Sequence, residues 1–185
     1  TRRSSDLKAD FAFLLALNQE TPFYYQLVDQ QENETSHTIT YQATTNSSSI
    51  SKQYVVYKDK NQMDVNISIN PLNNVSMQPR IIFPAPFLPE LKNENNSALD
   101  VIDGSDSFSK IYKDSIKADD GWIKPFVFGL ENKYFMHAFF KDENGFVQRA
   151  YTRLEDQFNA VLEGPEVSEK KSFSLSFYIG PKELS

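Results

Sequence analysis

The sequence predicts an all-β protein in which two large antiparallel sheets pack face to face, with only short helical segments. Short apolar segments recur along the 185 residues and are separated by clusters of Asn, Ser, Asp and Pro. Two of these segments alternate strictly between apolar and polar residues, which is typical of strands with one buried face. No long stretch repeats at the helical period, and roughly nine to eleven strands are expected, enough for two packed sheets.

Residues 1–20 leave two interpretations open. Asp6 is placed to cap a short helix that runs to Leu17, whereas the apolar run 11–17 equally suits a buried strand. From Pro22 onward the pattern favours strands. These are expected at 23–28, 38–43 and 54–57, with a loop at 47–49.

The clearest strand is the one in which Val65, Ile67 and Ile69 alternate with polar residues. This alternation predicts one buried face and one wet face. The segments that follow predict, in order, a turn, a short strand, a proline-rich extended segment and a long polar loop. They lie at 71–74, 80–83, 84–89 and 90–107.

The last third of the chain returns to strands, expected at 122–128, 134–140, 146–153, 158–162 and 173–179. In the last of these, apolar residues again alternate with serines. Residues 142–145 predict a hairpin turn with Gly145 at positive φ. Any helix is expected mainly at the N-terminus, near residues 84–107 or 129–134, or at the C-terminal end.

The charge balance argues against nucleic acid as a partner. The chain carries 19 Lys and Arg against 25 Asp and Glu, a net charge of −6, whereas nucleic-acid binding depends on a basic surface. The absence of cysteine excludes disulfides, thiolate nucleophiles and cysteine zinc sites. The longest apolar run, 11–17, is far shorter than the ~20 residues that a membrane helix needs.

No catalytic, cofactor-binding or metal-binding motif is recognisable. The carboxylate pairs lie at predicted turns and strand ends, where they would face solvent rather than converge across a cleft. The chain has no glycine-rich phosphate loop and no G-x-S-x-G elbow. Of the two histidines, His137 lies in an aromatic strand, where it is expected to be structural rather than a base. We therefore expect no enzyme activity, no cofactor and no metal.

Aromatic density between residues 122 and 140 is the remaining feature. One interpretation is core packing between the sheets, and the other is an apolar groove for an extended peptide or a lipid-proximal partner. Trp122, the only Trp, is expected to be buried and structural. The candidate interaction or structural residues in this stretch are Trp122, Phe126, Phe128, Tyr134 and Phe135.

The order of several motifs resembles a known family. Gly121-Trp122 precedes Tyr134-Phe135, and the chain then runs to the aromatic-Ile-Gly-Pro sequence at 178–181. Upstream, residues 54–59 and the alternating strand that follows fit the same order. This succession resembles the periplasmic domain of the YidC membrane protein insertases over residues 50–185, and more weakly over 20–49.

This resemblance implies a β-supersandwich fold and a single periplasmic domain over residues 1–185, excised from a larger protein anchored in the bacterial inner membrane. The domain would be an accessory module of the insertase. Its expected partners are the parent's own transmembrane insertase domain, the SecD–SecF part of the translocon and nascent membrane proteins. Gly180 and Pro181 would mark the end of the last strand and the exit toward the membrane, where an amphipathic helix follows in that family.

The supersandwich is shared with galactose-mutarotase-like proteins, which gives the alternative of a carbohydrate-binding or sugar-isomerising domain. Fold alone does not decide function. Mutarotase chemistry needs a His acid and a carboxylate base that face one cleft. His137 is the only plausible acid, and no carboxylate stands out as its partner. A bacterial adhesion or lipoprotein-like β-sandwich remains a third possibility.

Overall fold

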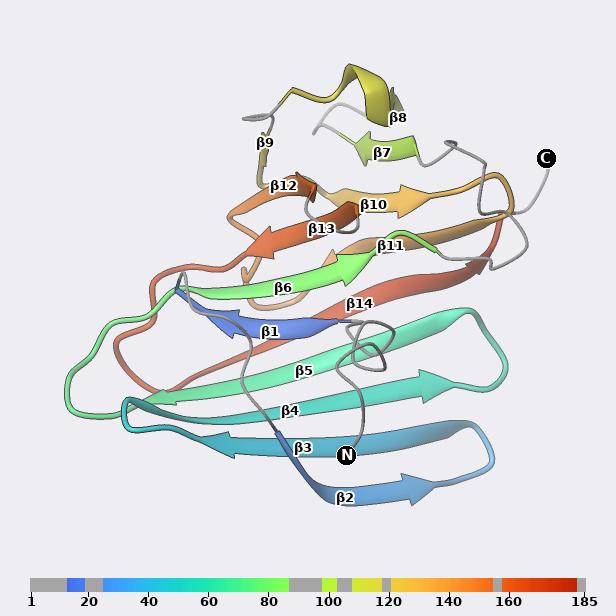
Figure 1. Ribbon diagram of the computed structural model, residues 1–185. Coiled ribbons are helices and arrows are strands. Elements are labelled where there is room, and N and C mark those ends of the chain that lie inside the picture. The colour runs from blue at the N-terminus through green and yellow to red at the C-terminus, as the bar shows by residue number, and fades with distance from the viewer. Residues whose placement is uncertain are drawn as a thin grey trace, which may run out of the picture.

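The computed structural model describes residues 13–18, 25–86, 98–102, 108–117, 121–154 and 158–182. Two sheets, in which every strand pairing is antiparallel, pack face to face in this part of the chain (Figure 1). Within it, the only helix is a single 3-10 turn at Lys113–Ser115. The predicted all-β class is therefore confirmed.

The smaller sheet has five strands and lies over the middle of the larger one (Figure 1). In spatial order its strands are β1 (Leu14–Leu17), β6 (Pro79–Pro84), β13 (Phe158–Glu163), β12 (Arg149–Leu154) and β9 (Gly121–Ile123).

The larger sheet has nine strands. In spatial order they are β2 (Gln26–Glu32), β3 (Ser36–Thr44), β4 (Ser48–Tyr57), β5 (Gln62–Pro71), β14 (Lys171–Pro181), β11 (Phe135–Asp142), β10 (Val127–Glu131), β7 (Ala98–Ile102) and β8 (Phe108–Tyr112). On one side of the molecule, strands β2 to β4 extend past β1, the edge strand of the smaller sheet (Figure 1).

Sequence alternation decides which face of the larger sheet is buried. In β5 the apolar residues Val65, Ile67 and Ile69 are buried, and the polar residues between them are half-buried, as predicted. Residues opposite one another in an antiparallel pair share a face, so their partners on β14, including Phe173 and Leu175, enter the same core. We call the face toward the smaller sheet the inner face and the opposite one the outer face.

The outer face of β3, β4, β5 and β14 is built from Ser, Thr, Asn and Gln side chains that hydrogen-bond across strands. The Ser174 hydroxyl donates to Asn66, the Asn66 amide to Gln53, and the Gln53 amide to Thr40, over distances of 2.7, 3.2 and 3.3 Å. These bonds join four neighbouring strands, so the polar half of the alternation also stabilises the sheet.

Several local predictions are wrong. Strand β7 lies within the predicted loop 90–107, and residues 129–131 belong to strand β10 rather than to a helical turn. The predicted strand 122–128 is broken into β9 and β10 at Lys124, whose φ is 47°. The open choice at the N-terminus is settled as a strand, β1, and residues before 13 lie outside the described part.

The turn at 142–145 forms as predicted but does not make a hairpin. Gly145 has φ 70°, and the Asp142 carboxylate accepts hydrogen bonds from the backbone N–H groups of Asn144, Phe146 and Val147. The turn leads from β11 in the larger sheet to β12 in the smaller one. Turn chemistry fixes the local reversal but not which strands pair afterwards.

Candidate functional site

The inner face of β3 and β4 forms a surface beside the edge strand β1. Ile50, Lys52, Tyr54 and Val56 of β4 lie opposite core residues of β5, so all four belong to the inner face. We call the part beside β1 the inner shelf. It consists of Tyr25, Ile39, Tyr41, Lys52, Tyr54 and Val56.

Lys52 is the unusual member of the inner shelf because it is a lysine that is only 7% exposed. Its Nζ lies 3.9 Å from the ring centre of Tyr25, 5.5 Å from that of Tyr54 and 5.6 Å from that of Tyr41. Rings at these distances attract a cation through their negative faces. The ammonium is therefore enclosed by three tyrosine rings.

The structure gives this ammonium no hydrogen bond and no ion pair with any described residue. Burial lowers the pKa of Lys52 from 10.5 to about 8, because the charged form loses its hydration. A buried cation without an acceptor is costly to a fold and is retained where it has a use. Lys52 is the strongest indication of a ligand site among the described residues.

Two of the tyrosines are fixed by the edge strand above them. The Tyr54 hydroxyl donates to the Phe13 carbonyl at 2.8 Å, and the Tyr25 hydroxyl donates to the Leu15 carbonyl at 3.3 Å. Burial is the main cause that raises the pKa of both phenols, so they stay neutral at physiological pH. These bonds hold the rings around Lys52 in fixed positions.

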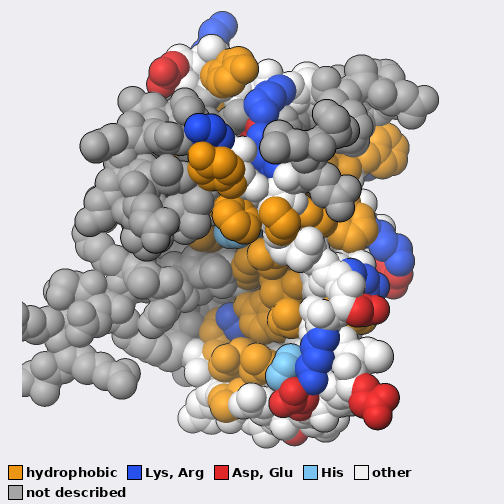
Figure 2. Space-filling model, turned by 90° about the vertical axis from the view of Figure 1, so that its right-hand side faces the viewer, with side chains coloured by type: hydrophobic (Ala, Val, Ile, Leu, Met, Phe, Trp, Pro, Cys, Tyr) orange, Lys and Arg blue, Asp and Glu red, His pale blue; other side chains and the backbone are white. Residues whose placement is uncertain are grey.

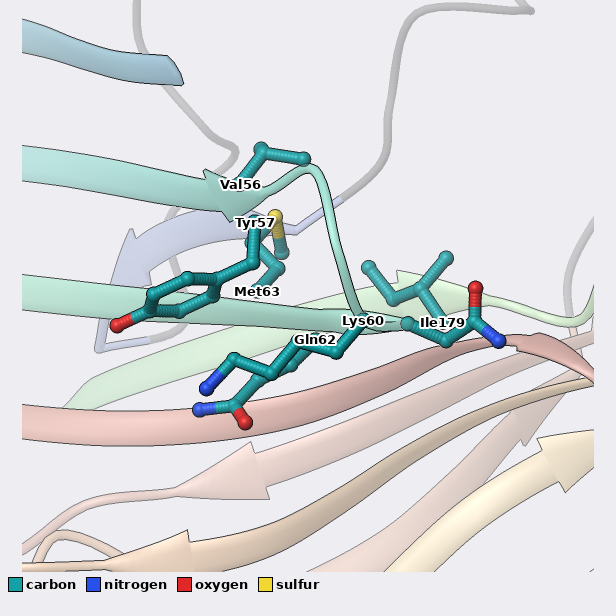
Figure 3. A pocket seen from close by; sticks show the side chains of 7 residues that line it. Val56, Tyr57, Lys60, Gln62, Met63 and Ile179 are labelled. Carbon is teal, nitrogen blue, oxygen red and sulfur yellow. The ribbon is translucent and has the colours of Figure 1, made fainter. Parts of the chain in front are cut away.

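At its other end the inner shelf continues into an open hollow of about 280 Å³ beside the β4–β5 turn (Figure 3). Val56 and Met63, which are opposite one another in the sheet, and Ile179 of β14 give it an apolar wall. Tyr57, Lys60, Asn61 and Gln62 supply its polar groups. Apolar walls with a few polar groups are typical of small-molecule sites.

Charged side chains border the inner shelf at the β2–β3 turn. The Glu32 carboxylate lies 2.6 Å from the Lys58 ammonium and 3.3 Å from Nε2 of His37. Figure 2 shows a band of hydrophobic side chains on this side of the molecule, with acidic, basic and histidine side chains beside its lower end. The ion pairs are exposed and contribute little to stability.

His137 lies on the inner face of β11, opposite Ile179, which lines the hollow. Its Nδ1 is 2.9 Å from the Pro84 carbonyl oxygen, which can only accept, so Nδ1 carries the proton of the neutral ring and Nε2 the lone pair. Burial outweighs this hydrogen bond and lowers the pKa of His137 below 6.5. The ring is therefore neutral at pH 7 and chemically a base.

The aromatic residues predicted as candidate interaction or structural residues do not form one site. Phe128 is fully buried, and the half-buried Trp122 packs on it with ring centres 5.3 Å apart. Phe126 and Tyr134 are 65% and 45% exposed, and Phe135 is half-buried. The two exposed residues, Phe126 and Tyr134, lie in the connections before β10 and β11 rather than in a strand.

Gly180 and Pro181 are the last two residues of strand β14, which ends at Pro181. Both pair with β11, and the Lys182 N–H donates to the Tyr134 carbonyl at 2.7 Å. Gly180 is required by a close approach, because a Cβ there would lie 2.6 Å from Cγ of Asn61. Residues 183–185, where a helix was expected to begin, lie outside the described part.

Two further observations concern metal and membrane. No cluster of three or more His, Asp or Glu side chains suited to a metal ion occurs among the described residues. Within the same residues no helix has the length and apolar character needed to cross a bilayer.

Comparisons with known proteins rest on the fold alone. The sequence matches no family model, and no curated protein matches it significantly. The fold is similar to that of the Slr1438 protein from Synechocystis sp. PCC 6803, with a TM-score of 0.55 and 9% identity over 85% of this chain and 66% of that one. It is also similar to a proposed aldose 1-epimerase from Escherichia coli K12, with a TM-score of 0.51 and 7% identity over 87% and 70%. A galactose mutarotase related enzyme from Lactobacillus acidophilus matches with a TM-score of 0.45 and 11% identity, over 89% of this chain and 73% of that one.

These comparisons correct the resemblance to the YidC family and the function that it implied. Of the two structures with a TM-score above 0.5, one is named as a proposed aldose 1-epimerase, and neither is named as a YidC periplasmic domain. The accessory role in membrane insertion is therefore contradicted, and so is the expectation of a domain without enzyme activity. The expected partners and periplasmic location followed from that resemblance and stay predictions.

The chain spans about two thirds of the length of these solved structures, 66% and 70% of the first two. At identities this low the likeness establishes the fold, and the activity of the whole proteins is not transferred with it.

Proposed function

We propose that this domain binds a sugar of the aldose type on the inner shelf. The observation that carries the proposal is the enclosure of Lys52 by Tyr25, Tyr41 and Tyr54, in a fold similar to that of a proposed aldose epimerase. A sugar presents hydroxyl groups at its rim and C–H groups on its faces. Tyrosine rings suit the C–H faces, and phenol and ammonium groups suit the hydroxyls.

The geometry supports a small ligand over an extended peptide. The inner shelf ends at the hollow of about 280 Å³ beside the β4–β5 turn. Polar groups surround this apolar floor on the β2–β3 and β4–β5 turns, at Glu32, His37 and Lys60. This combination of an apolar floor and a polar rim is what a sugar ring requires.

Calorimetric titration with D-glucose and D-galactose tests the proposal. The Tyr41→Ala variant removes one ring of the inner shelf and should weaken binding by at least about tenfold, or about 1.4 kcal/mol. Thr38→Ala is the matched control, because Thr38 lies on the same strand with its side chain on the outer face. Absence of binding by the wild type, or equal binding by the Tyr41 variant, would contradict the proposal.

A second candidate function, the exchange of sugar anomers, is favoured by His137. Anomer exchange needs a base that takes the proton of the anomeric hydroxyl and an acid, here water, that protonates the ring oxygen as the ring C–O bond breaks. The neutral His137 ring is a base at pH 7 and lies beside the residue Ile179, which lines the hollow.

Polarimetry of freshly dissolved α-D-glucose measures this activity. If His137 acts, the wild type should equilibrate the anomers faster than buffer, and His137→Gln should remove the excess rate. His37→Gln is the control, because His37 pairs with Glu32 at the rim. A wild-type rate equal to that of buffer would leave binding as the proposed function.

A further inference from the structure

The described groups that surround the Lys52 ammonium are uncharged. In the sheet Lys52 lies opposite Tyr41 on β3 and Ile67 on β5, and the Tyr25 ring lies over its ammonium. None of these groups carries a negative charge at neutral pH. At the rim of the inner shelf the described carboxylate is that of Glu32. It already pairs with Lys58 and His37.

We propose that the sugar bound on the inner shelf is acidic, a uronic acid whose carboxylate pairs with the Lys52 ammonium. This inference rests on the proposed function and names the class of its ligand. The Lys52 side chain is more than nine-tenths buried, and no described residue accepts a hydrogen bond from its ammonium, so among these residues its hydrogen-bonding capacity is unfilled. A ligand carboxylate fills it with a charge-assisted hydrogen bond, the strong kind in a site shielded from water.

The tyrosine rings alone do not account for this lysine. Ring faces attract a cation more weakly than water hydrates it, so the three rings offset only part of the lost hydration. Burial lowers the pKa of Lys52 to about 8 and so disfavours the charged form. A bound carboxylate reverses this balance, because an opposite charge at contact distance stabilises the ammonium.

A carboxylate fits this site better than a phosphate group. One buried ammonium matches a single negative charge, whereas a phosphate monoester carries close to two at pH 7. The chain has a net charge of −6, which repels a dianion more strongly than a monoanion.

Calorimetric titration of the chain at pH 7 with D-glucuronate, D-glucose and D-glucose 6-phosphate tests the inference. Glucuronate should bind at least about tenfold more tightly than glucose, as expected for one charge-assisted hydrogen bond. Lys52→Met should abolish this preference, and Lys52→Gln is a second variant in case the first fails to fold. Lys171→Met is the matched control, because Lys171 is also a lysine over an aromatic ring but is exposed.

Each outcome distinguishes the two proposals. Equal affinities for glucuronate and glucose would overturn the inference and leave the proposed function standing. Absence of binding by every sugar would overturn the proposed function itself. Tighter binding of glucose 6-phosphate than of glucuronate would overturn the carboxylate assignment, and so would a preference that survives in both Lys52 variants.

Discussion

At the scale of single residues, burial of the Lys52 ammonium lowers the stability of the fold, and the proposed ligand carboxylate would pair with that ammonium. Its pKa of about 8 in the folded chain lies below the 10.5 of an exposed lysine. Below pH 8 the amine is protonated in both states, and the folded state bears the full cost of the buried charge. Between about pH 8 and 10.5 the unfolded chain binds the extra proton, so this residue makes folding more favourable as pH rises.

We therefore expect the free energy of unfolding of the wild type to rise between pH 7 and pH 9.5 relative to that of Lys52→Met. Urea unfolding at the two pH values measures the difference. The Tyr25 and Tyr54 phenols titrate above this range because burial raises their pKa, and they do not interfere. Parallel pH profiles for the two proteins would show that Lys52 is hydrated in solution.

At pH 7 the same substitution should stabilise the fold. The displacement of the Lys52 pKa from 10.5 to about 8 corresponds to roughly 3 kcal/mol. The variant also loses the contacts between the ammonium and the tyrosine rings, which reduces this gain in stability by about 1–2 kcal/mol. Lys52→Met should therefore be about 1–2 kcal/mol more stable than the wild type while losing the preference for an acidic sugar. A lysine that served stability would show the opposite sign.

His137 should make stability depend on pH in the acid range. Its pKa is lowered by burial, so the unfolded chain binds a proton more readily than the folded one below about pH 6.5. The stability that the neutral ring provides is present above this pH and lost as pH falls. Comparison of His137→Gln with the wild type between pH 5 and 7 should show a smaller decline in the variant. Equal declines would assign the acid sensitivity to other groups.

At the scale of elements, the β10–β11 pair depends on a glycine. A Cβ at Gly129 would lie 2.4 Å from the His137 carbonyl oxygen and 2.6 Å from Cα of Ala138, and backbone atoms cannot move aside cheaply. Gly129→Ala should cost about 1–3 kcal/mol, as overpacking does. Gly121→Ala is the control, because its Cβ meets only the flexible end of Arg149. Similar melting temperatures for the two variants would contradict this.

The strands also show how much of the fold could be predicted from the sequence. Strict alternation located the strands around Val65 and Phe173 and assigned their buried faces correctly, because period two is a local property. Strand β7 was missed because Ala98–Ile102 is short and lies among polar residues. Pairing between distant strands, such as β6 with β13, depends on contacts that no local pattern contains.

The candidate site was missed for a related reason. Lys52 interrupts an alternation formed by Ile50, Tyr54 and Val56, and a lysine in the apolar phase of such a strand is a signal that could have been found. Its enclosure depends on Tyr25 and Tyr41 from other strands, which only the folded chain brings together. The dense aromatic stretch 122–140 gave the stronger local signal, but its rings divide between the core and the surface.

At the scale of the whole molecule, a buried carboxylate connects the far end of the larger sheet with its centre. Glu131 of β10 has a side chain only 4% exposed, and it forms ion pairs with Lys110 of β8 and with Lys182, which follows β14, the latter at 2.9 Å. The two lysine side chains are 42% and 26% exposed. The carboxylate thus ties together strands that are well separated in the sequence.

The two lysines should therefore act non-additively. Because either one can neutralise the carboxylate, Lys110→Met or Lys182→Met alone should cost about 1 kcal/mol. The double variant leaves a buried charge unpaired and should cost about 3–5 kcal/mol. Addition of Glu131→Gln to the double variant should recover much of this loss, because it removes the charge that lacks a partner. Urea unfolding of the wild type and the four variants measures the coupling. A double variant whose loss equals the sum of the two single losses would show that each lysine acts independently.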